Sequence, residues 1–443
     1  MGVTSVIRCL GLDGRCYESM IRFFRSTGWD LDKLTERWCQ VVKKYAPLER
    51  MNGRIKLIGD GVKKDKEGRY MPGVKRLVQE SETVSKPQYI HGHLFGGGGA
   101  LIEVGTKRFC IPLNMRVQDG VKEIFQWEDE IRRQGSHVEE MIVLLSQVAQ
   151  YTEENAYILL DAYFLSTNAL KKIADQNKKE KYNIQMVTRA KISSKAYHKP
   201  LPRKPGQRGA TPKKGQEVKL QKLFETETFT EAEVQFYDGV KQIKYYSVDL
   251  LWGPKLYQEL RFVLTIVGDN RIILVSTDLS LDPISIVELY CQRFKIEQLF
   301  KEAKQTVFGF SYHFWTKAMP KLNHFRKKTD PDPLTQVKDK KARDKVSRTL
   351  KAIEGYVQLS CIAIGLLQII SLKFFDHAES VSMRWMRTYR NPVWSEATVN
   401  DFLKLHIIHL LDLCPDLPIT QIIQSKQNYA KRLKDPPELQ NTA

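Results

Sequence analysis

The stretch Ala156-Tyr157-Ile158-Leu159-Leu160-Asp161 is a short apolar run that closes on a carboxylate. Its length and its lack of polar residues before Asp161 predict a strand buried on both faces. A similar run from Arg54 to Gly59 leads into Asp60-Gly61, which predicts a second strand that ends at a turn. Helical periodicity surrounds these runs, at 31–45, 121–150 and 167–177. The alternation of strands and helices predicts an α/β fold.

The composition of the 443-residue chain is that of a globular protein with more than one module. Hydrophobic residues make up 42% and charged residues 27%, which excludes a largely disordered chain. The longest apolar stretch, Val357 to Ile370, is shorter than the roughly 20 residues of a membrane span, so we expect no membrane contact. The formal net charge of +19 favours a polyanionic partner, of which nucleic acid is the commonest.

The seven cysteines are scattered and show no zinc-binding spacing, and the N-terminus shows no secretion signal. These features predict reduced thiols and a cytoplasmic protein, or a nuclear one if the source is eukaryotic.

Two proline-interrupted stretches account for nearly all of the net positive charge. Residues 189–222 contain eleven Lys and Arg against one acid, and residues 317–351 contain twelve against four. Such composition predicts no regular element. The stretch 189–222 is either a solvated loop or a basic arm that lies on a phosphate backbone, and the sequence leaves both readings open.

A long helix is expected after Pro283, a residue suited to a first helical turn. At 100° per residue, its side chains Tyr290, Arg293, Glu297 and Lys304 fall within a sector of about 60°. The helix would thus present a phenol, two cations and a carboxylate along one face. An ordinary solvated face with an Arg293–Glu297 ion pair is the simpler reading, but it does not account for Tyr290.

A carboxylate flanked by cations suits a metal ion that acts on phosphate. Two-metal phosphoryl transfer needs several converging carboxylates, and Asp60 and Asp161 are the natural partners of Glu297 because they close buried strands. A turn or cap role is the alternative for each aspartate. Asp278, which follows the predicted strand 271–276, is the strongest rival acid.

These residues resemble the DDE transposases of bacterial insertion sequences. Tyr290, Arg293, Glu297 and Lys304 match the Tyr-x2-Arg-x3-Glu-x6-Lys signature of the group with a β-rich insertion in an RNase H-like core. Leu57 to Gly61 and Ile158 to Tyr163 resemble the first- and second-aspartate strands of that core. The resemblance covers about residues 54–310 and implies an RNase H-like mixed sheet with flanking helices.

The resemblance also implies a mechanism. Asp60, Asp161 and Glu297 would bind two Mg²⁺ ions, for which Mn²⁺ could substitute, and Tyr290, Arg293 and Lys304 would grip phosphates near the cleaved end. The partners would be double-stranded DNA, as terminal inverted repeats and target, and a second copy of the chain in the synaptic complex. Trp252 could stack on a flipped base if a hairpin forms, although a packed residue is the simpler reading.

The expected organisation follows from the same resemblance. Residues 1–50 would form a helical region that could contact DNA ends, 51–188 the first part of the catalytic core, and 189–265 the basic, β-rich insertion. Residues 266–316 would complete the core with the signature helix, and 317–443 would form a basic linker and a helical region. The expected location is the cytoplasm, on the nucleoid. A catalytically silent, transposase-derived DNA-binding protein is the alternative function, and a region of only 59 residues before Asp60 is shorter than the family often has.

Overall fold

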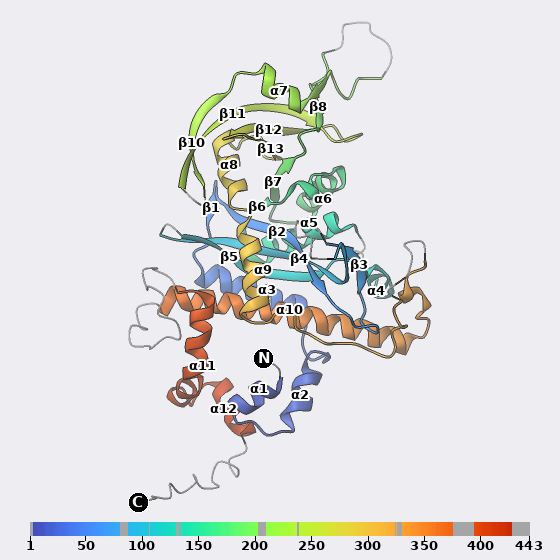
Figure 1. Ribbon diagram of the computed structural model, residues 1–443, viewed down its shortest axis with the longest axis vertical. Coiled ribbons are helices and arrows are strands. Elements are labelled where there is room, and N and C mark those ends of the chain that lie inside the picture. Colours follow the sequence, from blue (N-terminus) through green and yellow to red (C-terminus); the bar gives the residue numbers. More distant parts are fainter. Residues whose placement is uncertain are drawn as a thin grey trace, which may run out of the picture.

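The computed structural model of the chain describes residues 3–79, 87–105, 107–129, 133, 135–202, 210–236, 239–323, 325, 330–374 and 394–427. They form a mixed 13-stranded sheet with helices packed against it (Figure 1). The α/β class predicted from the sequence is confirmed, and the mixed sheet is compatible with an RNase H-like transposase core.

The centre of the sheet is formed by three parallel strands, β2 (Arg54–Asp65), β6 (Ala156–Leu159) and β7 (Ile184–Ala190). Beyond β2, the sheet continues with antiparallel strands: β4 (Tyr89–Val104), β5 (Lys107–Val117), β3 (Lys75–Val78) and the short β1 (Arg50–Met51), which pairs with β2. Successive residues of β6 join two separate hydrophobic clusters, one on each face, which is why the run is apolar throughout.

One face of the sheet is covered by α3 (Leu31–Tyr45), α5 (His137–Thr152) and α6 (Thr167–Lys179). On the other face lie α4 (Lys122–Trp127), α8 (Pro283–Cys291) and α9 (Lys295–Gln305), together with the long α10 (Lys340–Phe374). Short 3₁₀ turns, η2 (Ala162–Phe164) and η3 (Pro333–Gln336), connect some of these elements.

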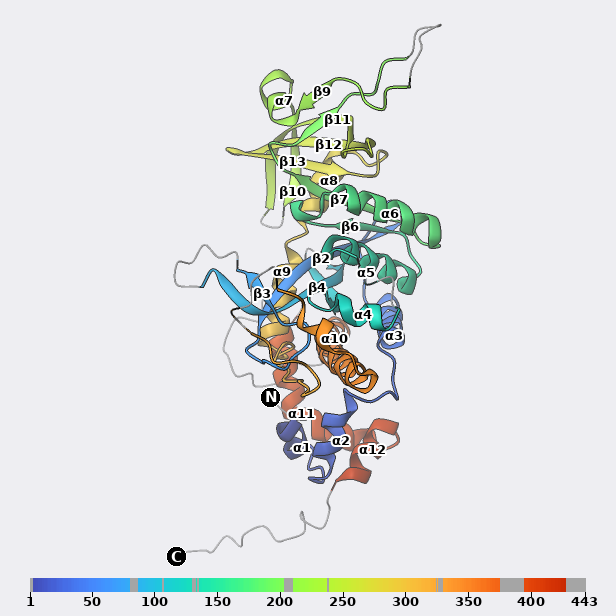
Figure 2. The ribbon, with the colours of Figure 1, turned by 90° about the vertical axis from the view of Figure 1, so that its right-hand side faces the viewer.

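The sheet runs from the three parallel strands into the predicted β-rich segment without a break (Figure 2). Strand β13 (Asn270–Ser276) pairs with β7, and β12 (Gln258–Val267), β11 (Gly239–Trp252) and β10 (Thr230–Phe236) follow. The basic stretch 189–222 is not wholly irregular, contrary to the prediction. It contributes the end of β7, the paired strands β8 (Lys195–Tyr197) and β9 (Glu217–Lys219), and the start of α7 (Leu220–Thr226).

Strand β2 does not end before Asp60, as the sequence predicted, but continues to Asp65. The physical reason is β4, whose residues pair with β2 along its whole second half, including Asp60 opposite Gly97. The glycine run Gly96 to Gly99 therefore lies inside a strand, where it also contains a bulge at Gly98/Gly99, rather than at the hairpin turn.

The single helix predicted after Pro283 is two helices. Helix α8 ends at Cys291 and α9 begins at Lys295. At the junction the backbone switches to tighter bonds, since the Gln292 N–H donates to Leu289 O at 3.2 Å and the Arg293 N–H to Tyr290 O at 3.1 Å. The four signature residues consequently do not share one straight face: Tyr290 lies in α8, Arg293 in the turn, and Glu297 and Lys304 in α9.

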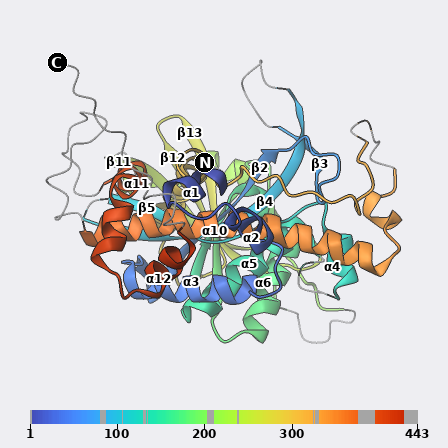
Figure 3. The same ribbon diagram turned by 90° about the horizontal axis from the view of Figure 1, so that it is seen from below.

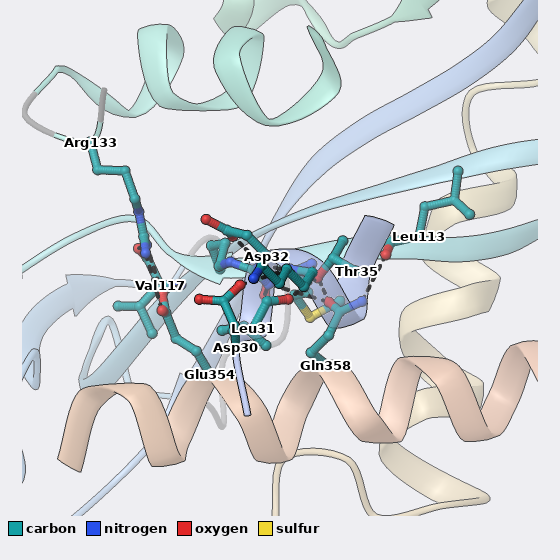
Figure 4. A network of polar contacts seen from close by, with 12 residues as sticks. Asp30, Leu31, Asp32, Thr35, Leu113, Val117, Arg133, Glu354 and Gln358 are labelled. Atoms are coloured by element: carbon teal, nitrogen blue, oxygen red, sulfur yellow. Dashed lines mark hydrogen bonds and ion pairs between the residues drawn. The ribbon is translucent and has the colours of Figure 1, made fainter. Parts of the chain in front are cut away.

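Helix α10 covers the free edge of β5 with side-chain hydrogen bonds. The Gln358 amide donates to Leu113 O at 2.8 Å and accepts from Met115 N at 3.0 Å, and Glu354 accepts from Val117 N at 2.9 Å (Figure 4). An exposed strand edge is thereby satisfied without another strand. Among the described helices, α10 has the length and composition to cross a membrane, which the sequence argument did not anticipate. Its packing against β5 is nevertheless that of a core helix.

The two ends of the described chain lie side by side (Figure 3). Helices α1 (Val3–Cys9) and α2 (Cys16–Phe23) meet α11 (Glu396–Leu413) and α12 (Pro418–Lys426). The contact includes a bridge between Leu12 and Gln427 and a hydrogen bond from Asp13 N to Lys426 O at 2.9 Å.

Candidate active site

The pairing of β2 with β6 places the two candidate aspartates beside each other. Ile58 lies opposite Leu159 in parallel register, so Asp60, within β2, and Asp161, just after β6, lie at the same level along the two strands. Asp161 begins the turn η2, and its carboxylate accepts from Tyr163 N at 2.6 Å. Thr188 of β7 holds the same turn by donating to Asp161 O at 2.8 Å.

Arg293 joins Asp60 to the third candidate acid. Its Nη1 lies 3.1 Å from Asp60 Oδ2 and its Nη2 lies 3.2 Å from Glu297 Oε1. Asp60 is fixed further by the Gly61 N–H, which donates to Oδ1 at 2.7 Å. Arg293 follows Asp60 by 233 positions in the sequence, and Glu297 follows it by 237. The Arg293 guanidinium contacts both carboxylates and so links these distant residues.

The three carboxylates lie within electrostatic range of one another. Burial raises the pKa of Asp60; the Gly61 amide and Arg293 oppose that shift, while the negative charges of Asp161 and Glu297 add to it. Like charges that converge in this way favour a bound cation, because a cation relieves their mutual repulsion.

The glycine run of β4 determines how closely α9 approaches the sheet. A Cβ built on Gly97 would lie 2.8 Å from Cε1 of Phe300, which is far inside contact distance. Phe300 is one turn along α9 from Glu297, so the absence of a side chain at Gly97 lets the helix that carries Glu297 lie directly over β2 and β4. The run is thus a packing surface and not a phosphate-binding loop.

An open cleft of about 590 Å³ is lined by two of the three acids, Asp60 and Glu297, and by Lys304. Two further lysines, Lys63 of β2 and Lys301 of α9, line the same cleft and were missed from the sequence. Lys301 lies four residues after Glu297, on the same face of α9, and this spacing could have identified it. Lys63 carried no comparable signal.

Tyr290 is half-buried beside the acids. Burial raises the pKa of its phenol, with Arg293 and Arg189 acting against the shift and Asp161 adding to it. Arg189, at the end of β7, had been assigned only to the basic stretch, yet its charge acts on this site.

The rival residues lie elsewhere. Asp278 is level with the start of β6, at the opposite end from Asp161, where it accepts from the Tyr157 hydroxyl at 2.7 Å and from the Ser280 hydroxyl at 2.6 Å. His93 is buried between Tyr312 and Pro72 O. Trp252 is half-buried against a hydrophobic cluster, in keeping with the packed reading.

The donor chemistry of the three acids fits a hard divalent cation, which prefers carboxylate oxygens. Their arrangement is more open than a finished metal site. Within the described part of the chain, no three His, Cys, Asp or Glu side chains lie close enough together to hold a metal ion. Arg293 occupies the space between Asp60 and Glu297 instead.

Residues 131–317 match the family described as Transposase DDE domain. The matched segment contains Asp161, Tyr290, Arg293, Glu297 and Lys304, whereas Asp60 lies outside it. No curated protein matches the chain. Together with the fold, the match supports a DDE transposase whose partner is DNA.

Proposed function

We propose that the protein is an insertion-sequence transposase that cuts DNA at the ends of its element and joins those ends to target DNA. It belongs, on this proposal, to the group with the Tyr-x2-Arg-x3-Glu-x6-Lys signature and a β-rich insertion at 189–265. The observation that carries the proposal is the contact of Arg293 with both Asp60 and Glu297, beside Asp161.

Asp60, Asp161 and Glu297 would hold two Mg²⁺ ions, or Mn²⁺ in their place. When bound, such ions supply activation of the attacking hydroxyl and charge stabilisation of the leaving oxygen at phosphorus. The carboxylates are suited to this role because two of them extend from adjacent strands and the third from a helix packed on the same strands, so their positions are set by the core.

Arg293, Tyr290 and Lys304 would bind the DNA phosphates next to the cleaved bond. Arg293 is held at 3.1–3.2 Å by two carboxylates and offers a planar guanidinium that matches phosphate geometry. Lys304 lines the open cleft and would contribute charge from the far end of α9. Two copies of the chain would bring two element ends together, and no membrane takes part.

The test uses the purified chain, Mg²⁺ and a DNA duplex that carries the inverted repeats flanking its coding sequence. We expect cutting at the 3′ ends of the element and joining to a plasmid target. Glu297→Gln and Asp161→Asn should each lower the cutting rate at least about a hundredfold, since each removes a charge that holds the metal. Glu302→Gln, on the same helix but turned away from the cleft, is the matched control.

Full activity in either carboxylate variant would contradict the metal assignment. DNA binding without any cutting by the wild-type chain would instead indicate the catalytically silent DNA-binding protein. Cutting without joining would indicate a nuclease.

A further inference from the structure

A second hollow, of about 740 Å³, lies on another part of the core. It is formed by the segment 24–33, which comprises the loop between α2 and α3 and the first turn of α3, together with Arg116 at the end of β5, Arg133, and Arg348 and Lys351 of α10. We call it the Arg348 hollow. It shares no residue with the cleft lined by Asp60 and Glu297, so any ligand it binds meets the protein at a separate place.

The floor of the Arg348 hollow is formed by arginines that are paired with carboxylates. Arg116 donates to Asp32 and to Thr35, each at 3.1 Å, and Arg133 contacts Glu354 at 2.7 and 3.1 Å (Figure 4). Arg116, Thr35, Arg133 and Glu354 are largely buried, whereas the Asp32 side chain is exposed, and each arginine has a carboxylate partner. The positions of Arg116 and Arg133 are therefore fixed, and their charges are neutralised by carboxylates of the protein itself.

The rim of the hollow carries cations whose charge is not balanced. Lys33 and Arg348 are exposed, and neither has an ion-pair partner among the residues that the structure describes. Arg25 donates to Trp315 O at 3.0 Å rather than to a carboxylate, whereas Lys351 pairs with Glu128 at 3.3 Å. Six cations and four acids line the hollow, and the acids Asp30 and Asp32 are exposed, so the charge that the hollow presents is positive by a small excess.

Helix α10 explains why these cations face the same way. Arg348 and Lys351 are three residues apart, and Glu354 and Gln358 continue the same helical face onto β5. The face of α10 that packs on the edge of β5 therefore extends beyond the end of that strand. There it carries Arg348 and Lys351, which line the hollow together with the segment 24–33.

We propose that the Arg348 hollow binds the phosphate backbone of double-stranded DNA outside the catalytic cleft, with Lys33 and Arg348 as the phosphate contacts. The hollow is far larger than a single phosphate ion needs, and its free charges lie at an exposed rim, as contacts to an extended polyanion require. The inference rests on the proposed function in that it takes DNA as the partner. It adds a second contact surface, which would hold DNA that is not being cut.

The experiment measures how the affinity of the full chain for a DNA duplex depends on salt, in the absence of divalent metal so that no strand is cut. In the double variant Lys33→Ala, Arg348→Ala, the slope of log affinity against log salt should become shallower by about two. The control is Lys178→Ala, Lys179→Ala, an equal change of charge on exposed residues of α6 that line neither the hollow nor the cleft.

The cutting assay with Mg²⁺ separates this inference from the proposed function. The folded Lys33, Arg348 double variant could show the same salt dependence of DNA affinity as the wild type while the wild-type chain cuts DNA. That result would contradict DNA binding at the Arg348 hollow and leave the proposed function standing. Equal losses of slope in the control pair would also contradict binding at the hollow, because the effect would then be one of net charge. Absence of DNA binding by the wild-type chain would overturn both.

Discussion

Asp60 occupies a position that opposes its own ionisation. Burial raises its pKa above the ordinary value of 3.8, and the charges of Asp161 and Glu297 contribute to the shift. A carboxyl whose pKa is higher in the folded state loses stabilising free energy as pH rises through that folded pKa, so at neutral pH the ionised Asp60 weakens the metal-free protein. On the proposed function, activity and stability are therefore opposed at this residue.

Asp60→Asn is accordingly expected to stabilise the metal-free protein at pH 7, by about 1–3 °C in melting temperature, while it abolishes DNA cutting. Asparagine keeps an oxygen that accepts from Gly61 N but carries no charge. Thermal melts in the presence of a chelator would measure the effect. Asp65→Asn on the same strand is the control and should lower the melting temperature. A hydrogen bond from Lys64 lowers the pKa of Asp65, so its ionised form stabilises the protein at pH 7. A lower melting temperature for Asp60→Asn would contradict the prediction.

His93 should make the protein sensitive to acid. Its Nε2 donates to Pro72 O at 2.8 Å and its Nδ1 accepts from the Tyr312 hydroxyl at 2.6 Å, which describes a neutral ring. Burial lowers the pKa of His93 from 6.5 to about 4. The stabilising contribution of the neutral ring is complete above pH 6.5 and is lost as pH falls from 6.5 towards 4, by up to about 1.4 kcal/mol per pH unit.

Denaturant titrations between pH 7 and pH 4 would measure this loss. His93→Gln should flatten the pH dependence in that window, although it lowers stability at pH 7. The exposed His313→Gln should leave the dependence unchanged. An equal slope in wild type and His93→Gln would exclude His93 as its source.

The candidate acids could be predicted from the sequence because each belongs to a local pattern. Asp161 closes an apolar run, and Glu297 lies at helical spacing from Arg293. Asp60 was identified for a reason that proved wrong, since it lies within a strand and not at its end. Contributions that depend on the tertiary arrangement, such as that of Lys63 to the cleft, leave no local pattern and could not be predicted.

At the scale of elements, the contact between β4 and α9 should control catalysis. Gly97→Ala would place a methyl group against the ring of Phe300 and push α9, with Glu297, away from the two aspartates. Because small displacements of catalytic groups are costly, we expect the cutting rate to fall about ten- to a hundredfold while DNA affinity stays near that of the wild type. The double variant Gly97→Ala, Phe300→Leu removes the clashing ring atoms and should recover part of the rate. No recovery would indicate that the loss has another origin.

The break between α8 and α9 shows where periodicity fails as a predictor. Gln292, Arg293 and Phe294 have ordinary helical propensities, so nothing in their identity announces the tighter turn. Hydrogen bonds that span three residues rather than four shorten the helix there, and Arg293 turns towards Asp60. The spacing of the signature residues predicted one face of a straight helix. In the structure the chain bends between α8 and α9, and this bend places the signature residues around the acids.

At the scale of the whole molecule, the lysines of the β-rich end contribute unequally to the net charge of +19, because some of them are paired with acids. Lys195 pairs with Glu217 at 2.9 Å and Lys199 with Glu259 at 2.7 Å, so part of the basic stretch is neutralised locally. Lys191, Lys213 and Lys222 have no acid partner among the described residues. These three are exposed members of the stretch that are available to bind phosphate.

Replacing Lys191, Lys213 and Lys222 with alanine should therefore make the salt dependence of DNA binding shallower by about 2.7 in slope, if each contacts one phosphate. Replacing Lys195 and Lys199, which are already paired, should change the slope less per residue. Titrations at several salt concentrations would distinguish the two sets. An unchanged slope in the triple variant would show that these lysines do not contact DNA.

The contact between the two chain ends was beyond prediction from sequence. Residues 1–50 and 317–443 each gave helical periodicity, but α1, α2 and α12 are short, and short helices reveal little about their partners. Their contact depends on a bridge between Leu12 and Gln427, more than 400 positions apart. Only the folded core brings such distant segments together.

The seal that α10 forms over β5 also has a consequence for biosynthesis. Val117 leaves the ribosome long before Glu354, Gln358 and Gln368, and the roughly 250 residues between them take about 12 to 50 s to translate. Throughout that interval the nascent chain displays an unpaired strand edge that could pair with another nascent chain. Chaperone demand should thus peak before α10 emerges, and ribosome stalling ahead of codon 340 should be the most damaging place for synthesis to stop.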